Sequence, residues 1–265
     1  MSSLSNHKTQ KNGIKKQKTR KVVPRGQANL FGFHAVEEAW RNPNRKINRL
    51  FVTQNAWKTL SEKLTNVTLN RPEPEFLTRD ELDKILPGQV HQGIAVDTDP
   101  LPEMFLQDII IQNKKADKSL ILMLDQVTDP HNVGAISRSA CAFGACAIIQ
   151  QRRHAPTPEG VLAKTASGAL EHLPMIEETN LSEAIEELQA AGYTALALDE
   201  TGEDLKSALT AKADKVVLVL GAEGKGLRPK IKQTCDKLVR IPANGPVGSL
   251  NVSNAAASAL YALAP

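Results

Sequence analysis

Three segments of the chain place polar side chains and glycine directly after short apolar runs. Residues 125–138 (DQVTDPHNVGAISR) follow LILML, residues 221–226 (GAEGKG) follow VVLVL, and residues 242–254 (PANGPVGSLNVSN) follow LVRI. Apolar runs of this length suit buried strands, and ligands bind beyond the carboxyl ends of strands in an open parallel sheet. We therefore expect the three segments to converge on one edge of a sheet and to form a binding site.

Asn132 and Arg138 carry the chemistry of the first segment. Asn is a residue type that caps helices, and a helix opened by Asn132 would hold Arg138 about one and a half turns later. A lone Arg on a helix is usually solvated, but the apolar neighbours Ala135, Ile136 and Ala140 predict a largely buried helix. An Arg in that setting suits phosphate recognition, because its planar guanidinium matches phosphate oxygens.

The second segment is a glycine loop, with Gly221, Gly224 and Gly226. A phosphate-binding P-loop would need Lys and Ser or Thr after the last glycine, where Leu227 stands, and the spacing also departs from the dinucleotide fingerprint. Glu223 in the middle would repel a pyrophosphate. The loop suits a close backbone approach to a neutral or cationic ligand, or it is a tight turn with an exposed carboxylate.

Small polar residues dominate the third segment, where Ser249, Asn251, Ser253 and Asn254 precede and open an Ala-rich stretch. Ser and Asn cap helices, so capping alone would account for them. Four such side chains beside the free amides of a helix start would equally serve to hold a ligand. The residues by themselves leave both interpretations open.

The elements that must position these segments alternate regularly from about Ser119 onward. Short apolar runs predict strands over 120–124, 147–150, 194–198, 216–220 and 238–241. Helical periodicity falls between and after them, over 133–143, 159–170, 181–191, 229–235 and 252–263. Strands that alternate with helices form a parallel sheet covered on both faces, so we expect an α/β fold.

A smaller α/β pattern precedes this unit. Helices are predicted over 33–40, 56–64 and 79–85, and strands over 48–53 and 93–96. The proline-containing stretch that follows predicts a linker. We therefore divide the chain into an arm (1–26), a small domain (27–98), a linker and lead-in (99–118) and a large domain (119–265).

Charge is unevenly distributed along the 265 residues. The net charge is +4, yet residues 1–25 hold eight basic and no acidic residues, which leaves 25 basic and 29 acidic residues in the remainder. We expect the basic arm to be disordered. It is either a solubilising tail or a tether for a polyphosphate, because cations that neutralise phosphates release counterions.

Composition excludes several classes of protein. No apolar run approaches the roughly 20 residues that span a bilayer, and the N-terminus lacks the apolar core of a secretory signal. Three cysteines (Cys141, Cys146 and Cys235) are too few and wrongly spaced for a disulfide framework or a zinc site. We therefore expect no membrane partner, no metal and a cytoplasmic location. Aromatic content of 4% argues against a stacking platform for single-stranded nucleic acid.

The three segments together resemble the SpoU/TrmH family of RNA ribose 2′-O-methyltransferases. The motifs that carry the resemblance are N-x-G-A-x-x-R over 132–138, L-G-A-E-G-x-G-L over 220–227 and I-P-x-x-G-x-V-x-S-L-N-V-S-N-A over 241–255. Two shorter stretches, 32–38 (GFHAVEE) and 91–94 (HQGI), resemble flanking signatures in the small domain. The resemblance covers about residues 27–265 and leaves the arm outside.

The resemblance implies a fold, a cofactor and an assembly. The fold is a parallel sheet with a trefoil knot at its C-terminal end, the cofactor is S-adenosylmethionine, and the protein is a homodimer packed through the knotted domain. It implies cofactor contacts from Gly221, Ile241 and Leu250, and catalytic positions at Arg138, Glu223, Ser249 and Asn251. Substrate binding falls on Asn132 and Arg138.

The small domain resembles the ribosomal-protein-like RNA-binding domain of the large-subunit rRNA guanosine methylases in this family. The resemblance therefore implies 2′-O-methylation of a guanosine in large-subunit, 23S-type rRNA. Two alternatives stay open: a tRNA guanosine 2′-O-methyltransferase, and a non-catalytic RNA-binding or assembly factor that keeps the same fold.

Overall fold

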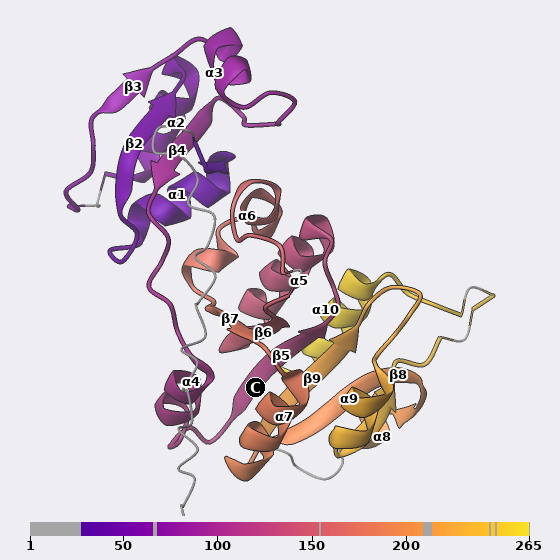
Figure 1. Ribbon diagram of the computed structural model, residues 1–265. Helices are drawn as coiled ribbons and strands as arrows, with labels where there is room; N and C mark the ends of the chain where they lie inside the picture. The colour runs from indigo at the N-terminus through magenta and orange to yellow at the C-terminus, as the bar shows by residue number, and fades with distance from the viewer. Residues whose placement is uncertain are drawn as a thin grey trace, which may run out of the picture.

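The computed structural model describes residues 28–65, 68–153, 155–208, 214–243, 245–246 and 248–264. They form two α/β units, a small one built from the first part of the chain and a larger one built from the rest (Figure 1). The predicted basic arm, residues 1–26, lies outside the described residues. None of the described helices is long and apolar enough to cross a membrane.

The small unit is a four-stranded sheet in the order β1-β4-β2-β3, with helices packed on it. Its strands are β1 (Leu30–Phe31), β2 (Ile47–Val52), β3 (Pro74–Phe76) and β4 (Ile94–Thr98), and its helices are α1 (Phe33–Arg41), α2 (Gln54–Lys63) and α3 (Arg79–Ile85). Side-chain caps begin two of these helices: Thr53 accepts from the amide of Ala56, and Thr78 forms a capping box with Glu81. The sequence predicted all three helices and the two longer strands, but not the short β1 and β3.

The large unit is a six-stranded parallel sheet in the order β10-β8-β9-β5-β6-β7. Its strands are β5 (Ser119–Asp125), β6 (Ala147–Gln151), β7 (Met175–Glu178), β8 (Thr194–Asp204), β9 (Lys215–Gly221) and β10 (Lys237–Arg240). Its helices are α5 (Pro130–Ala142), α6 (Gly160–Ala166), the 3-10 turn η1 (Ala169–Glu171), α7 (Leu181–Ala190), α8 (Leu205–Ala208), α9 (Pro229–Thr234) and α10 (Val252–Leu263). The predicted α/β fold with a parallel sheet is confirmed.

Helices cover both faces of this sheet. Along β5, Leu122 and Leu124 pack in the cluster that contains α5, α6 and α10, whereas Ile121 and Met123 pack in the cluster that contains α7 and α9. Successive strand residues point to opposite faces, so a strand buried on both sides is apolar throughout. The lead-in before β5 also contains a helix, α4 (Leu106–Gln112), whose Leu106 packs in the α7 cluster.

The last segment crosses back over the sheet. β10 is the edge strand beside β8, yet α10 packs against α5 and also contacts β9 and α8. The chain passes close to itself at Gly202 on β8, where an added Cβ would lie 2.5 Å from the backbone of Leu238 and Val239. A trefoil knot at this end stays a prediction from the family resemblance.

The two units are joined by an interface of buried apolar and charged side chains. One continuous buried cluster contains Val36 of the small unit and Val133 of the large one. Beside it Arg45 and Glu171 form an ion pair of 2.7 Å, with side chains only 7% and 2% exposed. Asn42 adds a hydrogen bond of 2.8 Å to the same carboxylate. These contacts fix the orientation of the small unit on α6 and η1.

Replacing Glu171 by Gln should lower the free energy of unfolding by about 3–5 kcal/mol, because Arg45 would keep an uncompensated charge in a buried site. Urea denaturation followed by circular dichroism measures the loss. Glu75→Gln is the matched control: it breaks the Arg49–Glu75 pair, whose side chains are 42% and 41% exposed. That control should cost less than about 1 kcal/mol. Equal losses in the two variants would contradict a structural role for the interface pair.

Candidate active site

Three side chains, one from each polar segment, meet beyond the carboxyl ends of the central strands. The amide Nδ2 of Asn251 donates to Glu223 Oε1 at 2.7 Å and to Asn132 Oδ1 at 3.2 Å. The amide of Asn132 donates in turn to Glu223 Oε2 at 3.5 Å. We call Asn132, Glu223 and Asn251 the polar triad. The predicted convergence of the three segments is therefore observed.

Helix capping orients two members of the polar triad. Asp129 caps α5 by accepting from the amide of His131, and Pro130 stands at the first helical position, which places Asn132 in the first turn. Asn251 is itself the cap of α10, and its Oδ1 accepts from the amide of Ser253 at 2.9 Å. Because Oδ1 is held by the cap, the Asn251 NH₂ group is left to face Glu223. The two ends of one side-chain amide thus serve two contacts, Oδ1 the helix cap and Nδ2 the polar triad.

The glycine loop presents Glu223 at the tip of a tight turn. A Cβ on Gly221 would lie 2.3 Å from the carbonyl carbon of Gly226, so only glycine permits this closure. Ala222 and Gly226 form an isolated antiparallel bridge, and Gly224 has a φ of 75°. The loop therefore projects an exposed carboxylate toward the two Asn amides.

A buried carboxylate holds the base of this loop. Asp125, at the end of β5, is fully buried and accepts from the Arg228 amide at 3.0 Å and from its Nε at 2.7 Å. Arg228 follows the glycine loop, so the pair joins the end of β5 to the start of α9. The sequence reasoning did not single out either residue. The only signal was an acidic residue at the end of an otherwise apolar strand.

Arg138 does not join the polar triad. Six residues separate it from Asn132, which is about 240° around a helix. The buried side of α5 is formed by Val133, Ile136 and Ala140, and Arg138 lies on the exposed side. Among the described residues it makes no hydrogen bond or ion pair. The expectation that Arg138 sits in a buried setting was wrong, because the apolar neighbours occupy a single face of the helix.

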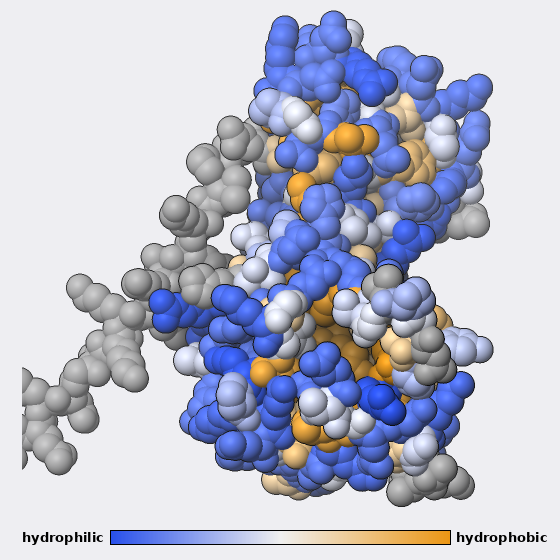
Figure 2. Space-filling model, turned by 90° about the vertical axis from the view of Figure 1, so that its right-hand side faces the viewer, coloured by the Kyte–Doolittle hydropathy of each residue, from blue (hydrophilic) through white to orange (hydrophobic). Residues whose placement is uncertain are grey.

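The other residues predicted for the site in and beside the third segment are exposed or half-buried. Ser249 is exposed, Leu250 is 46% exposed despite being apolar, and Ile241 is half-buried against the core. A Cβ on Gly248 would meet nothing within 4 Å. On the side of the molecule shown in Figure 2, apolar side chains gather in a hollow of the large unit between hydrophilic ones. An exposed apolar side chain beside open backbone and a carboxylate suits a ligand with both an apolar ring and a cationic group.

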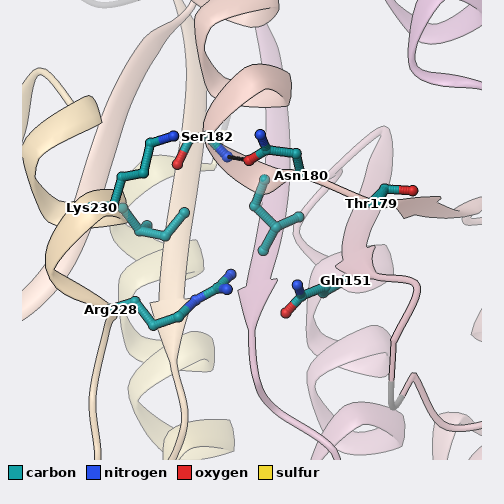
Figure 3. A pocket seen from close by; sticks show the side chains of 8 residues that line it. Gln151, Thr179, Asn180, Ser182, Arg228 and Lys230 are labelled. Atoms are coloured by element: carbon teal, nitrogen blue, oxygen red, sulfur yellow. Dashed lines mark hydrogen bonds between the residues drawn. The ribbon is translucent and has the colours of Figure 1, made fainter.

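A cavity of about 110 Å³ lies farther along the same sheet edge, between α7 and α9. Asn180 and Ser182 line it from the start of α7, Arg228 and Lys230 from the start of α9, and Gln151 from the end of β6 (Figure 3). None of the described residues that line this cavity carries a carboxylate. Its cations and amides suit an anionic or polar group.

The three cysteines have raised pKa values. Burial, with a smaller contribution from Asp236 and Asp125, raises the pKa of the Cys235 thiol to about 12. Burial also raises the pKa of Cys141 and of Cys146. Thiols with raised pKa values stay protonated and unreactive near neutral pH. The described residues contain no group of three or more His, Cys, Asp or Glu side chains that could hold a metal.

Comparison with known proteins assigns the chain to a protein family. Residues 119–261 match the SpoU rRNA Methylase family, and residues 30–104 match the family described as RNA 2′-O ribose methyltransferase substrate binding. The chain belongs to the SpoU rRNA methylase family. The resemblance that the three motifs indicated is confirmed, and the small unit is the substrate-binding domain that accompanies SpoU methylases.

SpoU relatives match over nearly their whole length. The 23S rRNA (guanosine-2′-O-)-methyltransferase RlmB of Pasteurella multocida is 36% identical over 88% of this chain and 96% of its own. The RlmB of Coxiella burnetii is also 36% identical, over 88% and 93%. The SpoU methyltransferase AviRb of Streptomyces viridochromogenes, solved in complex with AdoMet, has a TM-score of 0.71 at 24% identity over 89% and 88%. At that identity the structural match shows a shared fold.

Asn251→Ala should remove both the cap of α10 and the amide that donates to Glu223. Loss of the cap should cost about 0.5–2 kcal/mol of stability. Methyl transfer should fall about 100-fold, because small misplacements of site groups have effects of that size. Chemical denaturation and a methyl-transfer assay measure the two effects.

Thr78→Ala is the control for this variant, since Thr78 caps α3 by accepting from the amide of Glu81 and lines neither the polar triad nor the cavity. It should lose similar stability and keep near-normal methyl transfer. Equal losses of activity in both variants would show that Asn251 acts through fold stability alone.

Proposed function

We propose that this protein uses S-adenosylmethionine to methylate the ribose 2′-hydroxyl of a guanosine in large-subunit ribosomal RNA. The observation that carries the proposal is the polar triad, in which the three family motifs supply one side chain each to a single hydrogen-bonded site. The relatives named 23S rRNA (guanosine-2′-O-)-methyltransferase extend it to a guanosine in ribosomal RNA. We also place the protein in the cytoplasm, where ribosomal RNA is processed.

The cofactor fits the residues around the polar triad. Leu250 offers an exposed apolar surface, Ile241 is half-buried, and Gly221 ends β9 without a side chain. We propose that these three residues hold S-adenosylmethionine, largely through backbone groups. When bound, the cofactor supplies a methyl group that its positive sulfur has already activated.

The protein's task is then to orient a weak nucleophile, the ribose hydroxyl. Orientation of reacting groups can remove roughly 7–11 kcal/mol of a barrier in favourable cases. Glu223 holds the amides of Asn132 and Asn251 in fixed positions, and Ser249, exposed two residues before Asn251, is free to bond the ribose. A guanidinium stays protonated in proteins and is a poor base. We assign Arg138 to an RNA phosphate and to charge that develops on the ribose oxygen.

Methyl transfer from labelled cofactor should distinguish the candidate substrates. Purified protein incubated with protein-free 23S-type rRNA, or with bulk tRNA, should label the rRNA and leave the tRNA unlabelled. The label should map to the 2′-oxygen of a guanosine. Methylation of tRNA alone would refute the proposed substrate, and labelling of neither RNA would favour a non-catalytic factor.

We further propose a homodimer in which each site takes Arg138 from the other chain. Arg138 is exposed, without a described partner, and turned away from the polar triad of its own chain. α5, which carries it, packs against α10, where Tyr261 is 74% exposed and stacks edge-on with Phe143. A surface with an exposed aromatic ring and an unpaired Arg suits a protein interface.

Mixing two inactive variants tests the shared site. Arg138→Ala and Glu223→Ala should each abolish most methyl transfer. After unfolding and refolding together, half of the dimers should contain one chain of each kind, and each of these has one intact site. Activity should recover to about a quarter of the wild-type value. No recovery above the separate variants, with both refolded to dimers by light scattering, would place Arg138 in the site of its own chain.

A further inference from the structure

A small recess at the carboxyl ends of β5 and β6 contains a buried amide without a partner. Gln150 lies on β6, paired with Leu124 of β5, and its side chain is 3% exposed. Its Oε1 is the one buried side-chain nitrogen or oxygen without a hydrogen bond in the part of the chain that the structure describes. Buried polar groups nearly always form a hydrogen bond, so one without a partner indicates a functional role.

The walls of the recess belong to two loops. Gln126, Val127 and Thr128 line it after β5, and Arg153 lines it after β6. Gln126 has a φ of 61°, the left-handed region that residues other than glycine rarely adopt. Non-glycine residues in such conformations concentrate at functional sites. The loop that covers Gln150 is therefore held in an unfavourable conformation beside an unpaired amide.

The free space measures about 10 Å³, enough for one group of the size of a water molecule. Oε1 is an acceptor, so its complement is a donor of that size. The exocyclic amino group of a nucleobase meets both conditions, since it is a single small donor at the edge of a flat ring. None of the described residues that line the recess is a carboxylate, and the exposed cation Arg153 at its rim would meet the phosphate of the same nucleotide.

The recess also lies on the route between the two parts of the molecule that RNA must reach. Thr128 directly precedes Asp129, the cap of α5, and α5 presents Asn132 of the polar triad. On the other side the chain runs on to Glu159, which accepts a hydrogen bond of 3.3 Å from Asn29 of the small unit. The two loops that line the recess therefore lead to α5, which carries Asn132, and to the segment that contacts the small unit.

We infer that the recess around Gln150 recognises the base of the methylated nucleotide. Gln150 Oε1 would accept a hydrogen bond from the 2-amino group of that guanine. This rests on the proposed function, in which that nucleotide is a guanosine in RNA. Uracil has no amino group to insert, and adenine carries none at this ring position. The unpaired amide is then a specificity group whose partner arrives with the substrate.

The test compares guanosine with inosine, which differs only by lacking the 2-amino group. Two RNAs identical except for this base at the mapped methylation position are assayed for kcat/KM and for Kd. Wild-type protein should prefer the guanosine RNA by about 5- to 150-fold in kcat/KM. In Gln150→Leu the preference should fall to near one, with the guanosine value reduced to that of inosine.

Thermal melting distinguishes a role of Gln150 in base recognition from a role in packing. Leu fills a similar volume without an unpaired polar group, so Gln150→Leu should melt at the same temperature as wild type or higher. Gln112→Leu, an exposed position at the end of α4, is the matched control and should keep the wild-type preference.

Two results would overturn the inference: a wild-type protein that treats both RNAs alike, or a Gln150→Leu variant that still prefers guanosine. A failure of the proposed function would look different, as absence of methyl transfer to either RNA. In that case an RNA with inosine in place of every guanosine, compared by Kd with the guanosine RNA, would still report on the recess without a mapped position.

Discussion

The buried carboxylate of Asp125 is the interaction on which the site depends. It is fully buried at the end of β5 and accepts from the backbone and the side chain of Arg228. A charge in the interior is stable only when its partners are in place, so these bonds hold the β9–α9 connection against β5. Glu223 lies on that connection and Asn132 follows β5. One ion pair thus brings together groups that are 91 residues apart in the chain.

A second buried ion pair holds the substrate-binding domain in place at the interface between the two units. A continuous apolar cluster and the Arg45–Glu171 pair join the units through α6 and η1 rather than through the linker alone. An RNA that contacts the small unit therefore meets the catalytic edge at a fixed orientation. The loops that line the recess at Gln150 lead to α5 on one side and, on the other, to Glu159, which Asn29 of the small unit contacts.

Local features that do not favour stability gather at this edge. Gln126 has a left-handed backbone, the Gln150 amide is unpaired, and Leu250 exposes an apolar side chain. Arg138 and Ser249 project into solvent with no partner in the described fold. Such features also occur elsewhere: Gln92 and Ser167 have left-handed backbones, and Ile111 is 68% exposed. Departures of this kind are expected at sites where side chains contact a ligand and not other parts of the protein.

By itself the sequence determined the alternation of strands and helices, the three converging segments and the family, because each depends on local periodicity or on motifs that are continuous in the chain. The sequence did not predict the short strands β1, β3 and β7 or the helices α4 and α8, since segments of two to four residues, or a stretch beside prolines, carry little periodic signal. Helical spacing by itself places Arg138 opposite the apolar side of α5 that Val133, Ile136 and Ala140 form. Only the tertiary structure decided that Asp125 holds Arg228 and that Gln150 is buried without a partner. Each of these depends on which distant residues pack together, and spacing along one segment does not encode that.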